Sequence, residues 1–380
     1  MVMSSPRVAI SPSVLTWATR RTGLTDNELS KKFPKFEEWL EGKEKPTLPQ
    51  ARALAKAARL PFGRLLLDEP TGEDVGLPDF RTVNNSEIDE LSPDLQEVVT
   101  KAQQRLAWYS EYAMREGVQP PSLLSSVIEG TGAETAANAA RQSLGLEAFS
   151  PIAGSHKVRT LVALMESNGI LVARNSIVEN STKRPLAVEE FRGFTIVDDG
   201  FCLVFINTRD SKTAQLFSLA HELGHVVSAT PGLSDHSKNV EVERWCNKFA
   251  AEFIVPAGAV KNEHNSGRLL MEEVKNLGQR FGMSREAMLW RLVELKLCSQ
   301  EEANEVLPLI KGDPRDSRKD SGGAPPHHVL VRARVGGRFY DTVTQAAENG
   351  QISQRDAARY LGAANYESFM KLVETRNLST

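Results

Sequence analysis

The sequence predicts an α+β protein: a helical domain that contains a small antiparallel sheet, an all-α module before it and a small α/β unit after it. Apolar residues recur at helical spacing through much of the chain, most clearly over 93–115. Three runs rich in β-branched and aromatic residues, 169–174, 191–197 and 201–207, predict strands. A charged stretch rich in Pro, Gly and Ser over 311–326 separates the last unit from the rest.

The length and local composition divide the chain into five segments. At 380 residues it exceeds one ordinary domain, because most domains hold about 100–150 residues. We expect a helix-turn-helix-like module at 1–70, a linker and helical region at 71–155, an α+β domain at 156–300, a flexible linker at 301–326 and an α/β unit at 327–380.

The composition is that of a cytoplasmic protein without a membrane segment. The net charge of −3 does not by itself indicate a nucleic-acid partner. Cys202, Cys246 and Cys298 are odd in number and widely spaced, which does not fit a disulfide framework and favours a reducing compartment. The N-terminus lacks the apolar core of a signal peptide, and no apolar run approaches the roughly 20 residues of a membrane span.

The first 70 residues predict a small helical module. Thr25 is placed to cap a second helix, Trp39, Gly42 and Pro46 follow, and a third amphipathic helix is expected over 49–59. In this order of elements the segment resembles the lambda-repressor-like (XRE-type) helix-turn-helix family. Only a few residues separate Phe33 from Trp39, where that family places its groove-reading helix. Because such a helix must present several side chains to base edges, DNA binding is doubtful, and packing or protein contacts are the alternative role.

The middle and the tail of the chain carry further predicted elements. Helices are expected near 134–144 and 156–167, before the strands. The strands 191–197 and 201–207 are expected to pair as an antiparallel hairpin. In the tail, alternating residues over 328–335 predict a strand, followed by helices near 342–349 and 353–361.

The segment HELGH at 221–225 is the strongest chemical signal in the chain. On a helix, residues four apart lie on one face, so His221 and His225 can bind one Zn²⁺ ion. Glu222 directly follows His221 on the helix, close enough to act as general base on a zinc-activated water. Apolar neighbours on the same helix favour a metal site over two unrelated histidines, because buried imidazoles and carboxylates need partners.

The third metal ligand must come from elsewhere in the chain. Metzincin peptidases supply a histidine six residues after the second one, where this chain has Pro231, so that class is excluded. A gluzincin-type (zincin-like) site instead uses a Glu on a following helix, which makes Glu243 the choice, with Asn247 one turn later supporting a histidine. Weaker candidates remain: Glu241, Glu252, Asp235 and His236. His236 is alternatively a stabiliser of the oxyanion.

Together these residues resemble the ImmA/IrrE family of metallo-endopeptidases. The matching elements are RGF at 192–194, FSLAHELGHVV at 217–227 and the stretch from Glu243 to Pro256. The resemblance covers about 155–300. It implies one zinc ion per chain held by His221, His225 and Glu243, with Glu222 as the catalytic glutamate and Asn247 matching the family's asparagine.

The resemblance also implies a regulatory enzyme that cleaves a helix-turn-helix repressor. The alternative is a DNA-binding regulator or antitoxin-like protein whose zinc site is structural or vestigial. An intact Glu222 favours the peptidase, since a structural site needs no general base. The segment 277–297 has a helix-turn-helix appearance, with Arg285 and Arg291 on its second helix, but a helical hairpin that completes the peptidase domain is the preferred interpretation.

Overall fold

The computed structural model describes residues 6–22, 24–58, 60, 62–70, 92–228, 236–312, 326–363 and 365–377. These residues fall into two compact units: the first runs to residue 70 and includes 92–97, and the second begins at residue 98. None of the described helices is both long enough and apolar enough to cross a membrane.

The N-terminal unit is a small helical bundle. Its elements are α1 (Pro12–Thr22), α2 (Asp26–Lys32), α3 (Phe36–Leu40), α4 (Leu48–Ala58) and the 3-10 helix η1 (Phe62–Leu66). The predicted cap is confirmed: the Thr25 side chain accepts from the Glu28 backbone N–H, and the Glu28 carboxylate accepts from that of Thr25. The helix after α2 is five residues long, and Phe36 and Trp39 point into the core.

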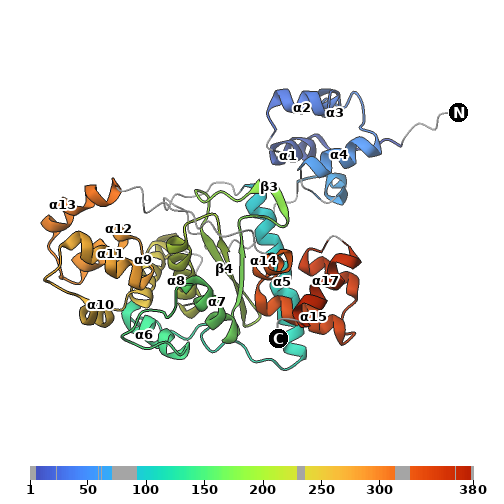
Figure 1. The fold of residues 1–380 in the computed structure, drawn as a ribbon. Coiled ribbons are helices and arrows are strands. Elements are labelled where there is room, and N and C mark those ends of the chain that lie inside the picture. The colour runs from blue at the N-terminus through green and yellow to red at the C-terminus, as the bar shows by residue number, and fades with distance from the viewer. Residues whose placement is uncertain are drawn as a thin grey trace. The chain divides into compact units, whose positions relative to one another are not determined.

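The larger unit contains a three-stranded sheet with helices on both sides (Figure 1). The strands are β1 (Leu171–Asn175), β4 (Gly193–Asp198) and β5 (Phe201–Asn207), in the order β1-β5-β4. A separate short hairpin joins β2 (Ile177–Val178) and β3 (Ser181–Pro185). All seven residues of β5 are buried, as expected for the central strand of a sheet covered on both faces.

Sequence analysis predicted the β4–β5 hairpin correctly but not the whole sheet. The two strands pair antiparallel with Asp198 opposite Phe201, which confirms the hairpin. β1, however, pairs parallel to β5, with Leu171 opposite Leu203, so the sheet is mixed and not antiparallel. The hairpin occupies one edge of β5, and β1 takes the other edge in the same direction as β5. Strand direction leaves no mark on apolar periodicity, which is why it was missed.

Helices form most of the larger unit. Those before and after the sheet are α5 (Pro93–Arg115), α6 (Ala133–Ser143), α7 (Lys157–Ser167), α8 (Lys212–Ser228), α9 (His236–Ile254), α10 (Ala257–Glu263), α11 (Leu270–Phe281), α12 (Arg285–Glu294) and α13 (Gln300–Lys311). In Figure 1, α7 and α8 cover one face of the sheet. The predicted hairpin at 277–297 corresponds to α11 and α12, which contribute Leu277, Phe281 and Leu289 to the same core as the sheet.

The predicted α/β tail is wrong in its strand. Residues 328–335 belong to α14 (His327–Val335), followed by α15 (Gly337–Glu348), α16 (Gln354–Leu361) and α17 (Tyr366–Asn377). Val331 and Val335, one helical turn apart, are buried, whereas Val329 is exposed. The buried residues therefore follow the helical period and not the period of two that a strand would show. The tail packs on β1 at Gly336, where a Cβ atom would lie 3.0 Å from the carbonyl oxygen of Val172.

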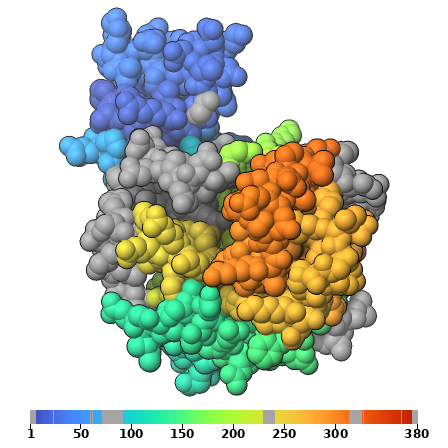
Figure 2. All heavy atoms as spheres, turned by 90° about the vertical axis from the view of Figure 1, so that its left-hand side faces the viewer, coloured from blue at the N-terminus to red at the C-terminus, as the bar shows by residue number. Residues whose placement is uncertain are grey.

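A buried arginine joins α6 to α9. Arg141 on α6 is fully buried and donates to the carbonyl oxygen of Phe253, at the end of α9, and to that of Glu147. Burial lowers the pKa of Arg141 to about 10, so the guanidinium remains charged at neutral pH. Figure 2 shows α6 side by side with α9, and Trp245 of α9 also donates to the carbonyl oxygen of Thr131. These bonds position α9.

We expect Arg141→Leu to lower the free energy of unfolding by about 2–4 kcal/mol, because buried carbonyl groups lose a charged donor. Urea denaturation followed by circular dichroism measures the change. The matched control is Arg115→Leu at the exposed end of α5, where the guanidinium makes a loose ion pair with Glu116, at 3.4 Å. Its effect should stay within about 0.5 kcal/mol. Equal effects of the two substitutions would contradict the role given to Arg141.

Candidate metal centre

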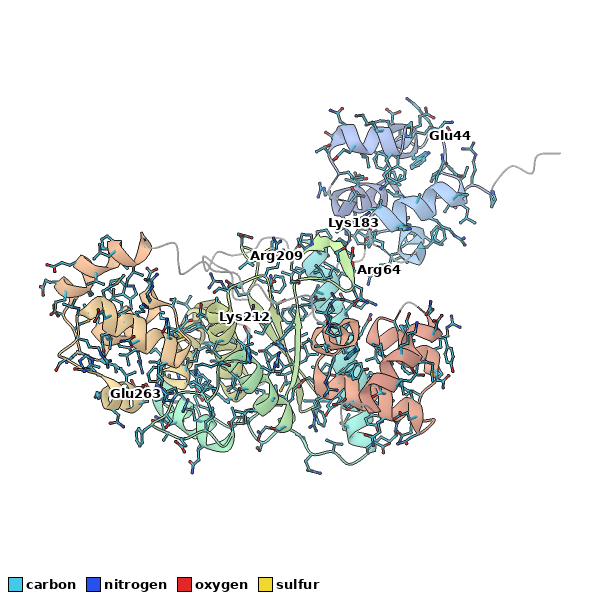
Figure 3. The ribbon with its side chains drawn as sticks, in the orientation of Figure 1. Glu44, Arg64, Lys183, Arg209, Lys212 and Glu263 are labelled. Atoms are coloured by element: carbon cyan, nitrogen blue, oxygen red, sulfur yellow. The ribbon has the colours of Figure 1, made fainter. Side chains whose placement is uncertain are left out.

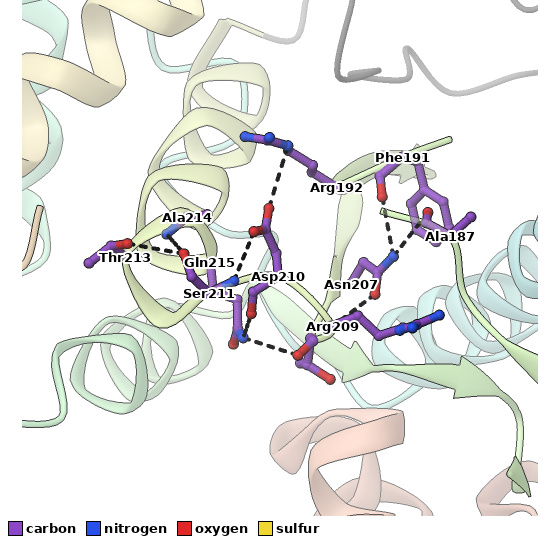
Figure 4. Close-up of polar contacts among 11 residues, drawn as sticks. Ala187, Phe191, Arg192, Asn207, Arg209, Asp210, Ser211, Thr213, Ala214 and Gln215 are labelled. Atoms are coloured by element: carbon purple, nitrogen blue, oxygen red, sulfur yellow. Dashed lines mark hydrogen bonds and ion pairs between the residues drawn. The ribbon is translucent and has the colours of Figure 1, made fainter. Parts of the chain in front are cut away.

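The start of α8 is fixed to the end of β5 by side-chain hydrogen bonds (Figure 4). The Asn207 amide donates to the carbonyl oxygens of Phe191, at 3.2 Å, and Ala187, at 3.3 Å. The Gln215 amide donates to the carbonyl oxygen of Asp210, at 2.7 Å, and so ties the first turn of α8 to the preceding loop. These bonds hold the two ends of the connection between β5 and the helix that carries HELGH.

Three side chains from α8 and α9 converge on one point. The Nε2 atoms of His221 and His225 lie 3.2 Å apart. Glu243 of α9 places Oε2 3.3 Å from Nε2 of His221 and Oε1 3.1 Å from Nε2 of His225. In tetrahedral zinc sites, bonds of about 2.0–2.1 Å place neighbouring ligand atoms roughly 3.3–3.4 Å apart. The three residues therefore fit a single divalent cation, and they form a group of possible metal ligands within the described residues.

The polar atoms at this point are suited to a cation. Both oxygens of Glu243 are buried without a conventional hydrogen bond, and each faces a ring nitrogen. Burial by itself would raise the pKa of Glu243, but His221 and His225 outweigh it and hold that pKa well below its usual range. The carboxylate is therefore ionised. A buried negative charge between two imidazoles is stabilised when a metal ion lies among them.

Asn247 orients the first histidine. Its Oδ1 lies 3.2 Å from Nδ1 of His221, one turn of α9 beyond Glu243. When Nδ1–H donates to this oxygen, the Nε2 atom is unprotonated and can bind a metal. The structure thus brings Asn247 to the position expected from the sequence.

Cys246 was not singled out in the sequence, yet it is buried beside His225. Burial raises the pKa of the Cys246 thiol, although His225 acts in the opposite direction, so the thiol is protonated at neutral pH. Gly224 lies between the two helices at this point, where a Cβ atom would come within 3.2 Å of the Cys246 Sγ. The Cys246 sulfur does not belong to the group of possible ligand atoms that lie within 4.8 Å of one another in the described residues, which leaves the two histidines and Glu243 as the ligand set.

Glu222 is buried against β4. Its Oε2 accepts a hydrogen bond of 2.8 Å from the Thr195 hydroxyl. A Cβ atom on Gly193 would lie 3.0 Å from Glu222 Oε1, so only glycine leaves room for the carboxylate. Sequence analysis did not identify Thr195. The available signal was the RGF segment, which precedes Thr195 and contains Gly193.

The other candidate ligands do not reach the centre. Glu241 is exposed on α9. Glu252 is buried but pairs with Arg291 and accepts from the Ala257 backbone N–H. Asp235 and the side chain of His236 lie outside the described residues, so the role expected for His236 at the oxyanion stays a prediction.

Comparison with known proteins gives one result. Residues 165–293 match the family model of the IrrE N-terminal-like domain, a peptidase domain. No curated protein and no solved structure matched the chain. The matched range contains the histidines, Glu222, Glu243 and Asn247. It supports the resemblance to the ImmA/IrrE family over the segment that carries the metal centre, and it suggests that this segment is a metallopeptidase domain of the IrrE type.

Proposed function

We propose that the protein is a zinc-dependent endopeptidase that cleaves a partner protein, a helix-turn-helix transcriptional repressor, in the cytoplasm. The observation that carries the proposal is the convergence of His221, His225 and Glu243 at tetrahedral spacing beside Glu222. A carboxylate held next to a metal position but not needed as a ligand is the arrangement that metal-assisted hydrolysis requires.

The roles of the residues follow from their contacts. When bound, zinc supplies Lewis-acid activation of water and of the scissile carbonyl. Glu222 takes the proton from the attacking water and returns it to the leaving amine. The Thr195 hydroxyl fixes the rotation of the Glu222 carboxylate. The side chains of His225 and Glu243 are 11% and 12% exposed to solvent, whereas that of His221 is fully buried. Substrate therefore approaches from the side of His225 and Glu243.

The alternative, a DNA-binding regulator with a vestigial zinc site, has less support. α3 occupies the place of a groove-reading helix but has only five residues. Phe36 and Trp39 are used in the core, and the exposed residues between them are Glu37 and Glu38. Carboxylates repel the phosphate backbone, so this helix is poorly suited to enter a DNA groove.

Co-expression with helix-turn-helix repressors encoded near the gene tests the proposal. We expect a repressor to be cut at one site in the presence of the wild-type protein, as seen by immunoblot and mass spectrometry of the fragments. If the purified protein shifts operator DNA while every such repressor stays intact, the regulator alternative replaces the peptidase.

We expect Gly193→Ala to reduce cleavage by about 10-fold or more while zinc stays bound, because the added methyl group displaces Glu222 and misplacement of a catalytic group costs rate. Cleavage rates and zinc content measure the two effects. Gly132→Ala is the matched control, since a Cβ atom there has nothing within 4 Å. Wild-type activity in Gly193→Ala would contradict the claim that the Glu222 carboxylate needs the space left by glycine at residue 193.

A further inference from the structure

A second site lies in the larger unit, away from the metal centre. It is a cavity of about 1420 Å³, lined by the first residues of α7 and α8, the end of β1, and parts of α11 and α14. None of His221, Glu222, His225 and Glu243 belongs to its lining. The cavity is therefore distinct from the group of residues to which the peptidase chemistry is assigned.

The lining is strongly cationic. Among the described lining residues are eight Lys or Arg side chains and one acidic side chain, Glu272. Arg159 and Lys275 are exposed at the cavity from α7 and α11, and Lys212 is the first residue of α8 (Figure 3). Helix N-termini carry partial positive charge, so the starts of α7 and α8 add to the same field. A concave surface of one sign concentrates ligands of the opposite sign.

The cations inside the cavity lack enough acidic partners. Burial lowers the pKa of Arg174, and nearby Arg159 lowers it further against the opposing effect of Glu166. Burial likewise lowers the pKa of Lys157, and Arg280 adds to this effect, whereas Glu263, the ion-pair partner of Arg280, opposes it. The Nε atom of Arg174 is buried and has no hydrogen-bond acceptor among the described residues. Arg159 and Arg174 are therefore neighbouring like charges at the cavity, and a bound anion would relieve their repulsion.

The rest of the wall is apolar. Leu216, Met283 and Leu330 are part of the lining, and the described lining contains no Phe, Tyr or Trp. Single-stranded nucleic acids bind through stacking on aromatic side chains, and duplexes are read by elements that protrude into a groove. A cationic hollow with aliphatic walls suits neither. It suits a small molecule that combines several negative charges with an apolar body.

We propose that this cavity binds a small organic phosphate of the nucleotide class with at least two phosphate groups. The phosphates lie between Arg159, Arg174 and Lys212, and the organic body lies against Leu216, Met283 and Leu330. The excess of cationic over acidic side chains in the described lining favours a ligand with more than one phosphate group. Arginine suits this role because its planar fork matches phosphate oxygens. The site is independent of the proposed peptidase activity and can exist without it.

Isothermal titration of the zinc-loaded full chain at 150 mM salt tests the proposal, with ATP, inorganic tripolyphosphate and adenosine as probes. We expect saturable binding of ATP and at least about 10-fold weaker binding of the other two probes. Tripolyphosphate lacks the organic body, and adenosine lacks the phosphate groups. Zinc content is measured after each titration, so that removal of metal by ATP is detected. Equal binding of tripolyphosphate and ATP would eliminate the organic body from the proposal.

Charge reversal locates the site. The double variant Arg159→Glu/Lys275→Glu changes two exposed cavity residues and should weaken ATP binding by about 100-fold, roughly 10-fold for each reversed charge. The control is Lys183→Glu, an exposed β3 residue outside the cavity (Figure 3), which should stay within about twofold of wild type. The absence of saturable ATP binding, unchanged binding by the double variant, or tighter binding of an oligonucleotide than of ATP would each overturn the proposal.

Discussion

Glu222→Gln should lower the rate of repressor cleavage by about 10²–10⁴-fold while the protein keeps its zinc, because the amide cannot accept the proton from water. The substitution preserves the shape of the side chain and leaves His221, His225 and Glu243 unchanged. Cleavage in a purified system and zinc content by mass spectrometry measure the two outcomes separately.

The matched control for this change is Glu301→Gln, on the exposed first turn of α13. It alters charge in the same way and should cleave at the wild-type rate. If Glu222→Gln also cleaves at the wild-type rate, Glu222 is not the base. If it loses both zinc and activity, the carboxylate contributes to metal binding, and the separation of roles proposed here is wrong.

Replacement of the metal ligand Glu243 should have a second large effect, on zinc affinity. We expect Glu243→Gln to weaken zinc binding by more than the roughly 10- to 100-fold cost of losing a hydrogen-bond partner of a ligand, since the charge at the metal is removed directly. Activity should fall with zinc occupancy. Because the metal binds the folded state, the zinc-dependent rise in melting temperature should also disappear. Competition with a chromogenic chelator gives the affinity.

Two variants on α9 form a graded series with Glu243→Gln. Asn247→Ala removes the acceptor that faces Nδ1 of His221 and should weaken zinc binding by about 10- to 100-fold. Glu241→Gln, exposed on the same helix, should leave it unchanged. An effect of Glu241→Gln as large as that of Glu243→Gln would show that general charge, and not coordination, controls the affinity.

The parts of the site that lie close together in the sequence were predictable. Helical spacing brings His221, Glu222 and His225 together, and one turn of helix relates Glu243 to Asn247. The contacts made across the fold were not. Thr195 reaches Glu222 from β4, and Cys246 reaches His225 from α9, because strand pairing and helix packing bring them there. No local pattern records such contacts.

The fold shows the same division between local and distant information. The residues of α5 match the predicted helix over 93–115, because its apolar stripe is long and regular. The parallel pairing of β1 with β5 and the helical form of 328–335 were missed. In α14 the sequence alternates, but packing of Val331 and Val335 against the rest of the unit selects the helix. Tertiary contacts decide such short segments.

X-ray absorption spectroscopy of the zinc-loaded protein tests the central claim most directly. Two imidazole nitrogens at about 2.0–2.1 Å and carboxylate or water oxygens at about 2.0–2.2 Å should account for the whole first coordination sphere of the metal. Cys246 lies beside His225, so a zinc–sulfur distance near 2.3 Å would replace this ligand set with another. A protein that takes up no zinc, or a spectrum with sulfur in the first sphere, would contradict the proposed metal centre.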